Sequence, residues 1–114
     1  MIQPTHLLII GYSPQPLTEF EVWNSLILIA DKIRMTRSGD PILKWFANGW
    51  SGWQWIEESH IAIDTILKWV GICIFSCKWF EPFTTGETIS QLLKLEQVSY
   101  HVLPDRGTIK ECDE

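Results

Sequence analysis

Apolar and polar positions first divide the chain into a short strand and a helix. Residues 6–13 are mostly apolar and end in a segment with two prolines, which predicts a buried strand followed by a turn. Thr18 and Glu21 then form a capping box, the signature of a helix N-terminus. Apolar side chains recur at helical spacing until residues 38–41 end the pattern: Phe20, Trp23, Ile27, Ala30 and Ile33.

The middle of the chain has the composition of strands. β-Branched and aromatic residues dominate residues 42–77, and Gly49 and Gly52 interrupt them. Four blocks, 42–48, 53–57, 59–66 and 69–77, predict strands. Thr84 and Glu87 form a second capping box, which predicts a short helix containing Ile89, Leu92 and Leu93, and residues 97–103 predict a last strand.

This order predicts an α+β fold. We expect β-α-β-β-β-α-β, with mergers among the middle blocks, in one domain covering residues 1–114. Strands that follow each other closely pair in an antiparallel way, so the expected architecture is a two-layer α/β sandwich with a mainly antiparallel sheet and both helices on one face. The other face of such a sheet needs a partner.

Composition and charge narrow the classes of function. The 114 residues are 46% hydrophobic and include seven Trp, enough for a core, and the net charge is -5. An acidic chain is a poor match for nucleic acid or an anionic membrane, and it is compatible with a cationic small molecule. No apolar run reaches the roughly 18 residues of a membrane span, and no secretory signal pattern is present, so we expect a cytoplasmic protein.

Cysteines and histidines are scattered, which argues against a metal site. Cys73 and Cys77 would lie about 13 Å apart on a strand, too far for a disulfide, so we expect these two and Cys112 to be free thiols. The three histidines are distant in sequence, and the chain contains neither a Cys-x-x-Cys nor a His-x-x-x-His pair. The sequence therefore argues against a zinc site.

Residues 50–77 carry the motif with chemical content. Ser51 and Gly52 come first, the sequence Glu58-Ser59-His60 follows, and a strand then ends in Phe-Ser-Cys at Cys77. In this order and at nearly this spacing, the residues resemble the processing and active-site region of the prokaryotic S-adenosylmethionine decarboxylases. The strand and helix order of that family also fits the chain from about residue 6 to residue 103.

The resemblance implies a proenzyme that makes its own pyruvoyl cofactor. Ser59 would attack the carbonyl carbon of Glu58, and elimination and hydrolysis would leave a pyruvoyl group on a second chain that starts at residue 59. That group would bind an amine substrate as a Schiff base and accept electrons as CO₂ leaves. By the same resemblance Cys77 returns the proton, Ser51 assists processing, and Trp45 stacks on the substrate's adenine.

Two positions depart from the family pattern. Asp64 stands where the family has the histidine that acts as a base in processing, and an exposed carboxylate is a weak base unless it is buried. Lys68 stands where the family commonly has a glutamate that binds the ribose hydroxyls, and lysine cannot accept their hydrogen bonds.

These departures leave three functions open. The first is supply of decarboxylated S-adenosylmethionine for spermidine synthesis, by a homodimer that completes its sites and covers its sheets by pairing. The second is decarboxylation of arginine or ornithine, and the third is an uncleaved, non-catalytic homologue that serves as a binding or oligomer subunit.

Structural interpretations apply to the same residues. Ser59 can be an ordinary strand serine and Cys77 a small buried hydrophobe. Trp50, Trp53 and Trp55 fit a core or a subunit interface better than a ligand site. Ser59 and His60 do not form a hydrolase pair, because neighbours on a strand point to opposite faces.

Overall fold

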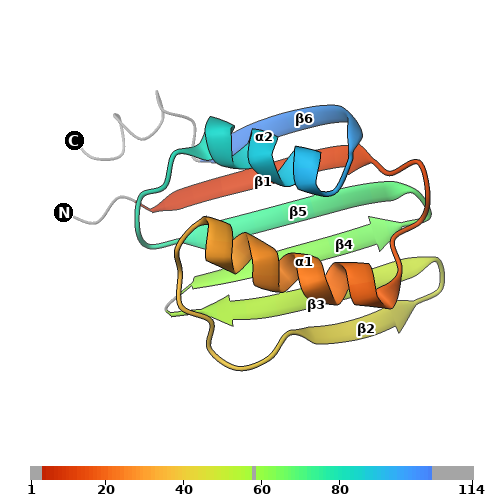
Figure 1. Cartoon of the computed structure of the whole chain (residues 1–114), viewed down its shortest axis with the longest axis horizontal. Coiled ribbons are helices and arrows are strands. Elements are labelled where there is room, and N and C mark those ends of the chain that lie inside the picture. The colour runs from red at the N-terminus through yellow and green to blue at the C-terminus, as the bar shows by residue number, and fades with distance from the viewer. Residues whose placement is uncertain (1–3, 58, 104–114) are drawn as a thin grey trace.

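The fold is a sheet with two helices on one of its faces. The computed structural model describes residues 4–57 and 59–103. Within these residues both helices lie in front of a single six-stranded sheet (Figure 1). The elements are β1 (Thr5–Tyr12), α1 (Glu19–Lys32), β2 (Ile42–Phe46), β3 (Gly49–Ile56), β4 (Ser59–Ile66), β5 (Trp69–Ser76), α2 (Pro82–Leu92) and β6 (Glu96–Leu103).

The sheet is antiparallel at every pairing of the described strands. Its strand order is β2-β3-β4-β5-β1-β6, so the first strand lies between β5 and the last strand. Helix α1 packs on β2, β3 and β4, whereas α2 packs on β1 and β6 (Figure 1). The expected α+β class and two-layer architecture are confirmed.

The middle of the sheet has one strand more than the expected order. The four predicted blocks stay separate, and β3 starts at Gly49 instead of residue 53. Gly49 is the first residue of β3, so it does not interrupt the strand. A Cβ built at Gly49 would lie 1.8 Å from the carbonyl oxygen of Thr65. A glycine inside this strand therefore marks a close approach of two backbones, and the chain turns before it, at Ala47 and Asn48.

The capping box of α1 is confirmed, but its predicted apolar stripe is partly wrong. Thr18 and Glu21 cap each other reciprocally at the start of the helix. Phe20 is 70% exposed and Trp23 is 36% exposed. The helix instead buries Val22, Ser25, Leu26, Ile29 and Ala30, because Gly52 of β3 leaves space for Val22 and Leu26.

Helix α2 begins earlier than the second predicted capping box. Pro82 occupies the first helical turn, and the side chain of Glu81 accepts a hydrogen bond from the backbone N–H of Thr84. Proline suits this position because its missing N–H has no partner there in any case. Thr84 and Glu87 lie inside the helix, so the box predicted from them is wrong.

The core lies between the sheet and the helices. Every second residue of the central strands is fully buried there, and these side chains are Leu7, Ile9, Ile61, Ile63, Ile72 and Ile74. Their neighbours point to the other face, which we call the open face because no described helix covers it. No helix in the described ranges has both the length and the apolar character required to cross a membrane.

Candidate active site

Ser59 lies at the tip of the β3–β4 hairpin, next to Cys77. It is the first residue of β4, it pairs with Ile56 of β3, and only 4% of its surface is accessible. Its hydroxyl oxygen accepts a hydrogen bond of 2.8 Å from the backbone N–H of Cys77. Strand β5 returns beside β4, with Phe75 opposite His60, and this register brings together two motif residues that are 18 positions apart.

The hairpin tip is held by Glu57. This residue has a φ of 45°, in the left-handed region that costs a residue with a side chain roughly 1–2 kcal/mol. Its backbone N–H donates to the carbonyl oxygen of Thr36, and its carboxylate accepts from the Thr36 N–H at 3.2 Å. Lys78 Nζ lies 2.8 Å from the same carboxylate. Hydrogen bonding to Lys78, and then to Thr36, lowers the pKa of Glu57.

Glu58, the residue proposed to precede the cleaved bond, lies outside the described residues. The residues on either side of it, Glu57 and Ser59, are both held by the contacts above. Both residues therefore contact the segment that follows β5, at Cys77 and Lys78, and Glu57 also contacts Thr36.

Ser51 and Asp64 form a second pair, on the open face. They lie opposite each other on β3 and β4, and Ser51 Oγ donates a hydrogen bond of 2.7 Å to Asp64 Oδ1. The side chain of Asp64 is exposed in the single chain. The burial that a carboxylate needs in order to become a stronger base is therefore not supplied by this chain alone.

The two pairs lie far apart within one chain. Ser59 and Asp64 are at opposite ends of β4, which separates them by about 16 Å at the rise of a strand. Their side chains also point to opposite faces, because Ser59 shares the buried side of β4 with Ile61 and Ile63. Asp64 cannot reach Ser59 of its own chain.

Trp45 lies on the helix side of the sheet. It packs against Trp50 with ring centroids 5.1 Å apart, and Trp50 contacts the core. The aromatic residue of β2 on the same face as Ser51 is Phe46, the residue after Trp45, and its ring lies 5.1 Å from Lys44 Nζ. The sequence analysis did not single out Phe46. Strand alternation could have found it, because the β2–β3 turn pairs Lys44 with Ser51, and Phe46 lies on the same face as Lys44.

Aromatic rings surround His60 on the open face. His60 stacks on Trp53 at 4.3 Å and on Phe75 at 5.8 Å between centroids. Burial among these rings, and next the nearby charge of His6, lower the pKa of His60 below its ordinary value of 6.5. His60 and Ser59 point to opposite faces, as expected, so they do not form a nucleophile and base pair.

The Cys73 thiol and the His6 imidazole, which do not belong to the motif, also lie together on the open face. His6 Nε2 lies 2.9 Å from Cys73 Sγ. Burial raises the pKa of the Cys73 thiol, and the charge of Asp64 raises it further, so the thiol is favoured over the thiolate. Among the described residues, neither Cys73 nor Cys77 is part of a disulfide, and Cys112 lies outside the described residues.

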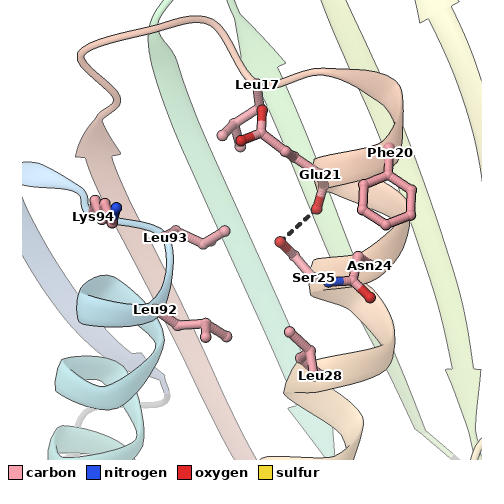
Figure 2. A pocket seen from close by; sticks show the side chains of 9 residues that line it. All are labelled: Leu17, Phe20, Glu21, Asn24, Ser25, Leu28, Leu92, Leu93 and Lys94. Atoms are coloured by element: carbon pink, nitrogen blue, oxygen red, sulfur yellow. Dashed lines mark hydrogen bonds between the residues drawn. The ribbon is translucent and has the colours of Figure 1, made fainter.

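The helix layer contains a separate groove. Figure 2 shows it between α1 and the C-terminal end of α2, with Phe20 and Leu28 on one side and Leu92 on the other. Its volume is about 330 Å³. The groove lies on the opposite layer from Ser51 and Asp64. Among residues 4–57 and 59–103, no three His, Cys, Asp or Glu side chains are grouped so that they could hold a metal ion.

Comparison with known proteins supports the fold and goes no further. No family model matches the chain, and no curated protein matches it in sequence. The crystal structure of the adenosylmethionine decarboxylase from Aquifex aeolicus VF5 is similar, with a TM-score of 0.72 and 15% sequence identity over 89% of this chain and 88% of that chain. At this identity the likeness shows a shared fold.

Proposed function

We propose that this chain is a pyruvoyl-dependent decarboxylase that cleaves itself between Glu58 and Ser59. The hydrogen bond from the Cys77 N–H to the Ser59 hydroxyl oxygen is the main support, because it joins the two motif residues at a hairpin tip with a left-handed residue. The similarity to an adenosylmethionine decarboxylase supports the same class of reaction.

Self-cleavage would use the backbone of the tip. The Ser59 hydroxyl attacks the carbonyl carbon of Glu58 and its proton moves to the amide nitrogen, so an ester replaces the peptide bond. A base then takes the Ser59 α-proton, the ester C–O bond breaks, and residue 58 leaves as a carboxylate. Water hydrolyses the remaining enamine to a pyruvoyl group and ammonia. The fixed tip supports the first step, because attack on an amide requires close approach and a strained backbone.

The surroundings of Ser59 suit a pyruvoyl group. This group would supply a carbonyl that accepts electrons when the substrate loses CO₂. A nearly inaccessible position at residue 59 would keep water away from the reacting carbon. Cys77 would hold the proton that the α-carbon receives, since its backbone already contacts residue 59 and a thiol gives and regains a proton near neutral pH.

The base would come from a second copy of the chain. Asp64 is about 16 Å from Ser59 of its own chain, and it is paired with Ser51 on the open face. If two open faces pack with their β4 strands running in opposite directions, Asp64 of one copy approaches residue 59 of the other from the open face, the side opposite to the Ser59 hydroxyl, where it would act on the α-proton. Packing would also bury Asp64, which makes a carboxylate a stronger base. The proposed enzyme is therefore a homodimer.

S-Adenosylmethionine is the proposed substrate, and its product would serve spermidine synthesis. The net charge of -5 suits a cationic amine. Lys68 cannot accept hydrogen bonds from ribose hydroxyls, so arginine and ornithine remain the alternative substrates. Release of ¹⁴CO₂ from each carboxyl-labelled amine distinguishes the three.

Intact mass under denaturing conditions tests the cleavage directly. We expect two fragments, 1–58 and 59–114, the second with a pyruvoyl N-terminus. Ser59→Ala should give one intact chain, and Ser99→Ala, an exposed serine on β6, should be cleaved like the wild type. An intact wild-type chain would support the uncleaved homologue instead, and a cleaved Ser59→Ala chain would refute the nucleophile.

Co-expression tests whether Asp64 acts on the other copy. Asp64→Asn alone and Ser59→Ala alone should both stay intact. When the two variants are expressed together, the Asp64→Asn chain should be cleaved, because its Ser59 would meet the Asp64 of its partner. If the Asp64→Asn chain stays intact in the mixed sample while the two variants still pair, the base does not act between copies.

A further inference from the structure

Three buried hydroxyl groups lie side by side at the end of the sheet that carries the proposed cleavage site. The register of β4 and β5 pairs His60 with Phe75. One step further along both strands, Ser59 therefore faces Ser76, and Ser76 pairs in turn with Thr5 of β1. Their exposed fractions are 4% for Ser59, 0% for Ser76 and 2% for Thr5. We call these three residues, on three adjacent strands, the hydroxyl row.

The hydroxyl row occupies core positions on the helix side of the sheet. At the next two positions on that side, each of the three strands carries fully buried aliphatic residues: Leu7 and Ile9 on β1, Ile61 and Ile63 on β4, and Ile72 and Ile74 on β5. All three strands change to a hydroxyl at the same end. A buried hydroxyl is costly unless it forms hydrogen bonds, so three of them in one place need partners there.

The hydrogen bonds of the hydroxyl row leave room for a continuous chain. Among residues 4–57 and 59–103, the buried Thr5 Oγ1 has no hydrogen-bond partner. Ser76 Oγ accepts a hydrogen bond of 3.0 Å from the N–H of Lys78. A hydroxyl can accept two hydrogen bonds and donate one, and facing hydroxyls on neighbouring strands can meet because their Cβ atoms lie about 4.5–5.5 Å apart. Ser76 can therefore donate to Thr5 Oγ1 and still accept from Ser59.

Ser76 is the cross-strand neighbour of Ser59 that can accept its proton in a hydrogen bond. On the other side Ser59 pairs with Ile56, which is fully buried and apolar. The Ser59 oxygen already accepts from the N–H of Cys77. A bond from the Ser59 O–H to Ser76 Oγ would fix the second end of this hydroxyl, so that the nucleophile is held in one orientation next to the Glu58 carbonyl carbon.

We propose that Ser76 is a positioning residue for self-cleavage and that Thr5 supports it: the Ser59 O–H donates to Ser76 Oγ, and the Ser76 O–H donates to Thr5 Oγ1. The bonds that form and break are those of the acyl shift given above, and the row adds orientation of the nucleophile. Its role rests on the proposed self-cleavage. Elimination removes the Ser59 oxygen together with residue 58, so the row acts before that step.

Crossed substitutions in the full chain separate the hydroxyl groups from their packing. Ser76→Ala should slow cleavage about tenfold or more, whereas Ser76→Thr, which keeps a hydroxyl, should stay within about twofold of the wild type. Thr5→Val keeps the shape and loses the hydroxyl, and Thr5→Ser does the reverse. Cleavage should be about fivefold slower in Thr5→Val and close to the wild-type rate in Thr5→Ser. Ser90→Ala removes a buried hydroxyl from α2 and should be cleaved like the wild type.

Intact mass at successive times after cell-free synthesis measures these rates, and hydroxylamine identifies the step that is slowed. At neutral pH hydroxylamine cleaves an ester between residues 58 and 59 and leaves a peptide bond there intact. Uncleaved Ser76→Ala should resist hydroxylamine, because its ester forms slowly. Uncleaved Asp64→Asn should be sensitive, because its ester has formed and lacks the base for elimination.

The outcomes distinguish the hydroxyl row from the cleavage itself. If the wild type is cleaved and Ser76→Ala is cleaved equally fast, or accumulates the ester, the row is refuted and self-cleavage stands. Faster cleavage of Thr5→Val than of Thr5→Ser would show that packing, and not the hydroxyl, matters at Thr5. An intact wild-type chain would refute self-cleavage. Urea unfolding compares Ser76→Ala with Ser90→Ala, and Ser76→Val, which has the shape of Ser76→Thr, replaces Ser76→Ala if that variant does not fold.

Discussion

At the scale of single residues, Glu57 links the proposed cleavage site to the rest of the fold. Its carboxylate contacts Lys78, which follows β5, and Thr36, which follows α1. Because these contacts favour the carboxylate, Glu57 stabilises the folded chain above its ordinary pKa of 4.5. That contribution is lost as the pH falls through the lowered pKa of the folded state.

Replacing Lys78 with methionine should raise the pKa of Glu57 toward 4.5, because the ammonium that stabilises the carboxylate is removed. NMR titration of the Glu57 carboxyl carbon measures this, in a Ser59→Ala background that keeps the chain intact. Lys32→Met should leave the titration unchanged. An unaltered Glu57 pKa in Lys78→Met would mean that the ion pair contributes nothing in solution.

His60 also lowers the stability of the fold as the pH falls, but for a different reason: its charged form is disfavoured in the folded chain, whereas that of Glu57 is favoured. Its pKa is lowered in the folded chain, mainly by burial between Trp53 and Phe75. The unfolded chain therefore binds a proton more readily, and His60 lowers the stability of the fold as the pH falls below about 6.5 and through the folded pKa.

His60→Phe should reduce the loss of stability between pH 7.5 and pH 5.5, because phenylalanine keeps the stacked ring and removes the titrating group. Urea unfolding of Ser59→Ala with and without His60→Phe at both pH values gives the difference of differences. His101→Phe, at an exposed position on β6, serves as the control. If the loss of stability with His60→Phe equals that of Ser59→Ala alone, the pH dependence comes from other groups.

At the scale of elements, three glycines have different roles in the sheet. A Cβ at Gly49 would collide with the backbone of Thr65, and one at Gly52 would lie 2.9 Å from Val22 of α1. At Gly71, on the open face, the nearest atom would be 3.9 Å away. The first two positions are therefore fixed by packing, whereas the third has space for a side chain.

Gly49→Ala should lower the free energy of unfolding by about 1–3 kcal/mol, because the new methyl group meets rigid backbone and forces β3 and β4 apart. Gly71→Ala is the matched control and should stay within about 0.5 kcal/mol of the wild type. Urea unfolding at pH 7.5 measures both. Equal stability of the two variants would refute the close approach of β3 and β4 at Gly49.

At the scale of the whole molecule, the layers are unequal. The helix layer buries one face of the sheet, while large apolar side chains remain accessible on the open face, among them Trp55, Ile66 and Trp69. An accessible apolar surface on this scale is typical of an interaction site. A second copy packed there would cover these residues and bring Asp64 toward Ser59, as proposed above.

The wild-type chain should therefore be a dimer in solution, and a charge on the open face should make it a monomer. Trp55→Lys is the test variant, because Trp55 is 50% exposed on that face. Phe20→Lys, at a position 70% exposed on the helix layer, should leave the dimer intact. Sedimentation equilibrium measures the mass of each. A monomeric wild type, or a dimer lost only in Phe20→Lys, would contradict pairing through the open face.

Local sequence signals located most elements and the candidate motif. The Thr18 and Glu21 box set the start of α1, because a helix cap depends on neighbours a few residues away. Ser59 was also identified from the sequence, because its motif, Glu58-Ser59-His60, consists of consecutive residues. Whether Ser59 becomes a nucleophile stays a prediction that chemistry must test.

Sequence alone determined the fold class, the order of strands and helices apart from one strand in the middle of the sheet, and the residue types available for chemistry. Tertiary structure decided which of these residues meet: Ser59 with Cys77, Ser51 with Asp64, and Tyr12 with Trp69. It also decided that Trp45 faces the helices and Phe46 the open face. The physical reason is that a shift of one residue in strand register moves every side chain to the other face, and the register is set by packing between distant segments.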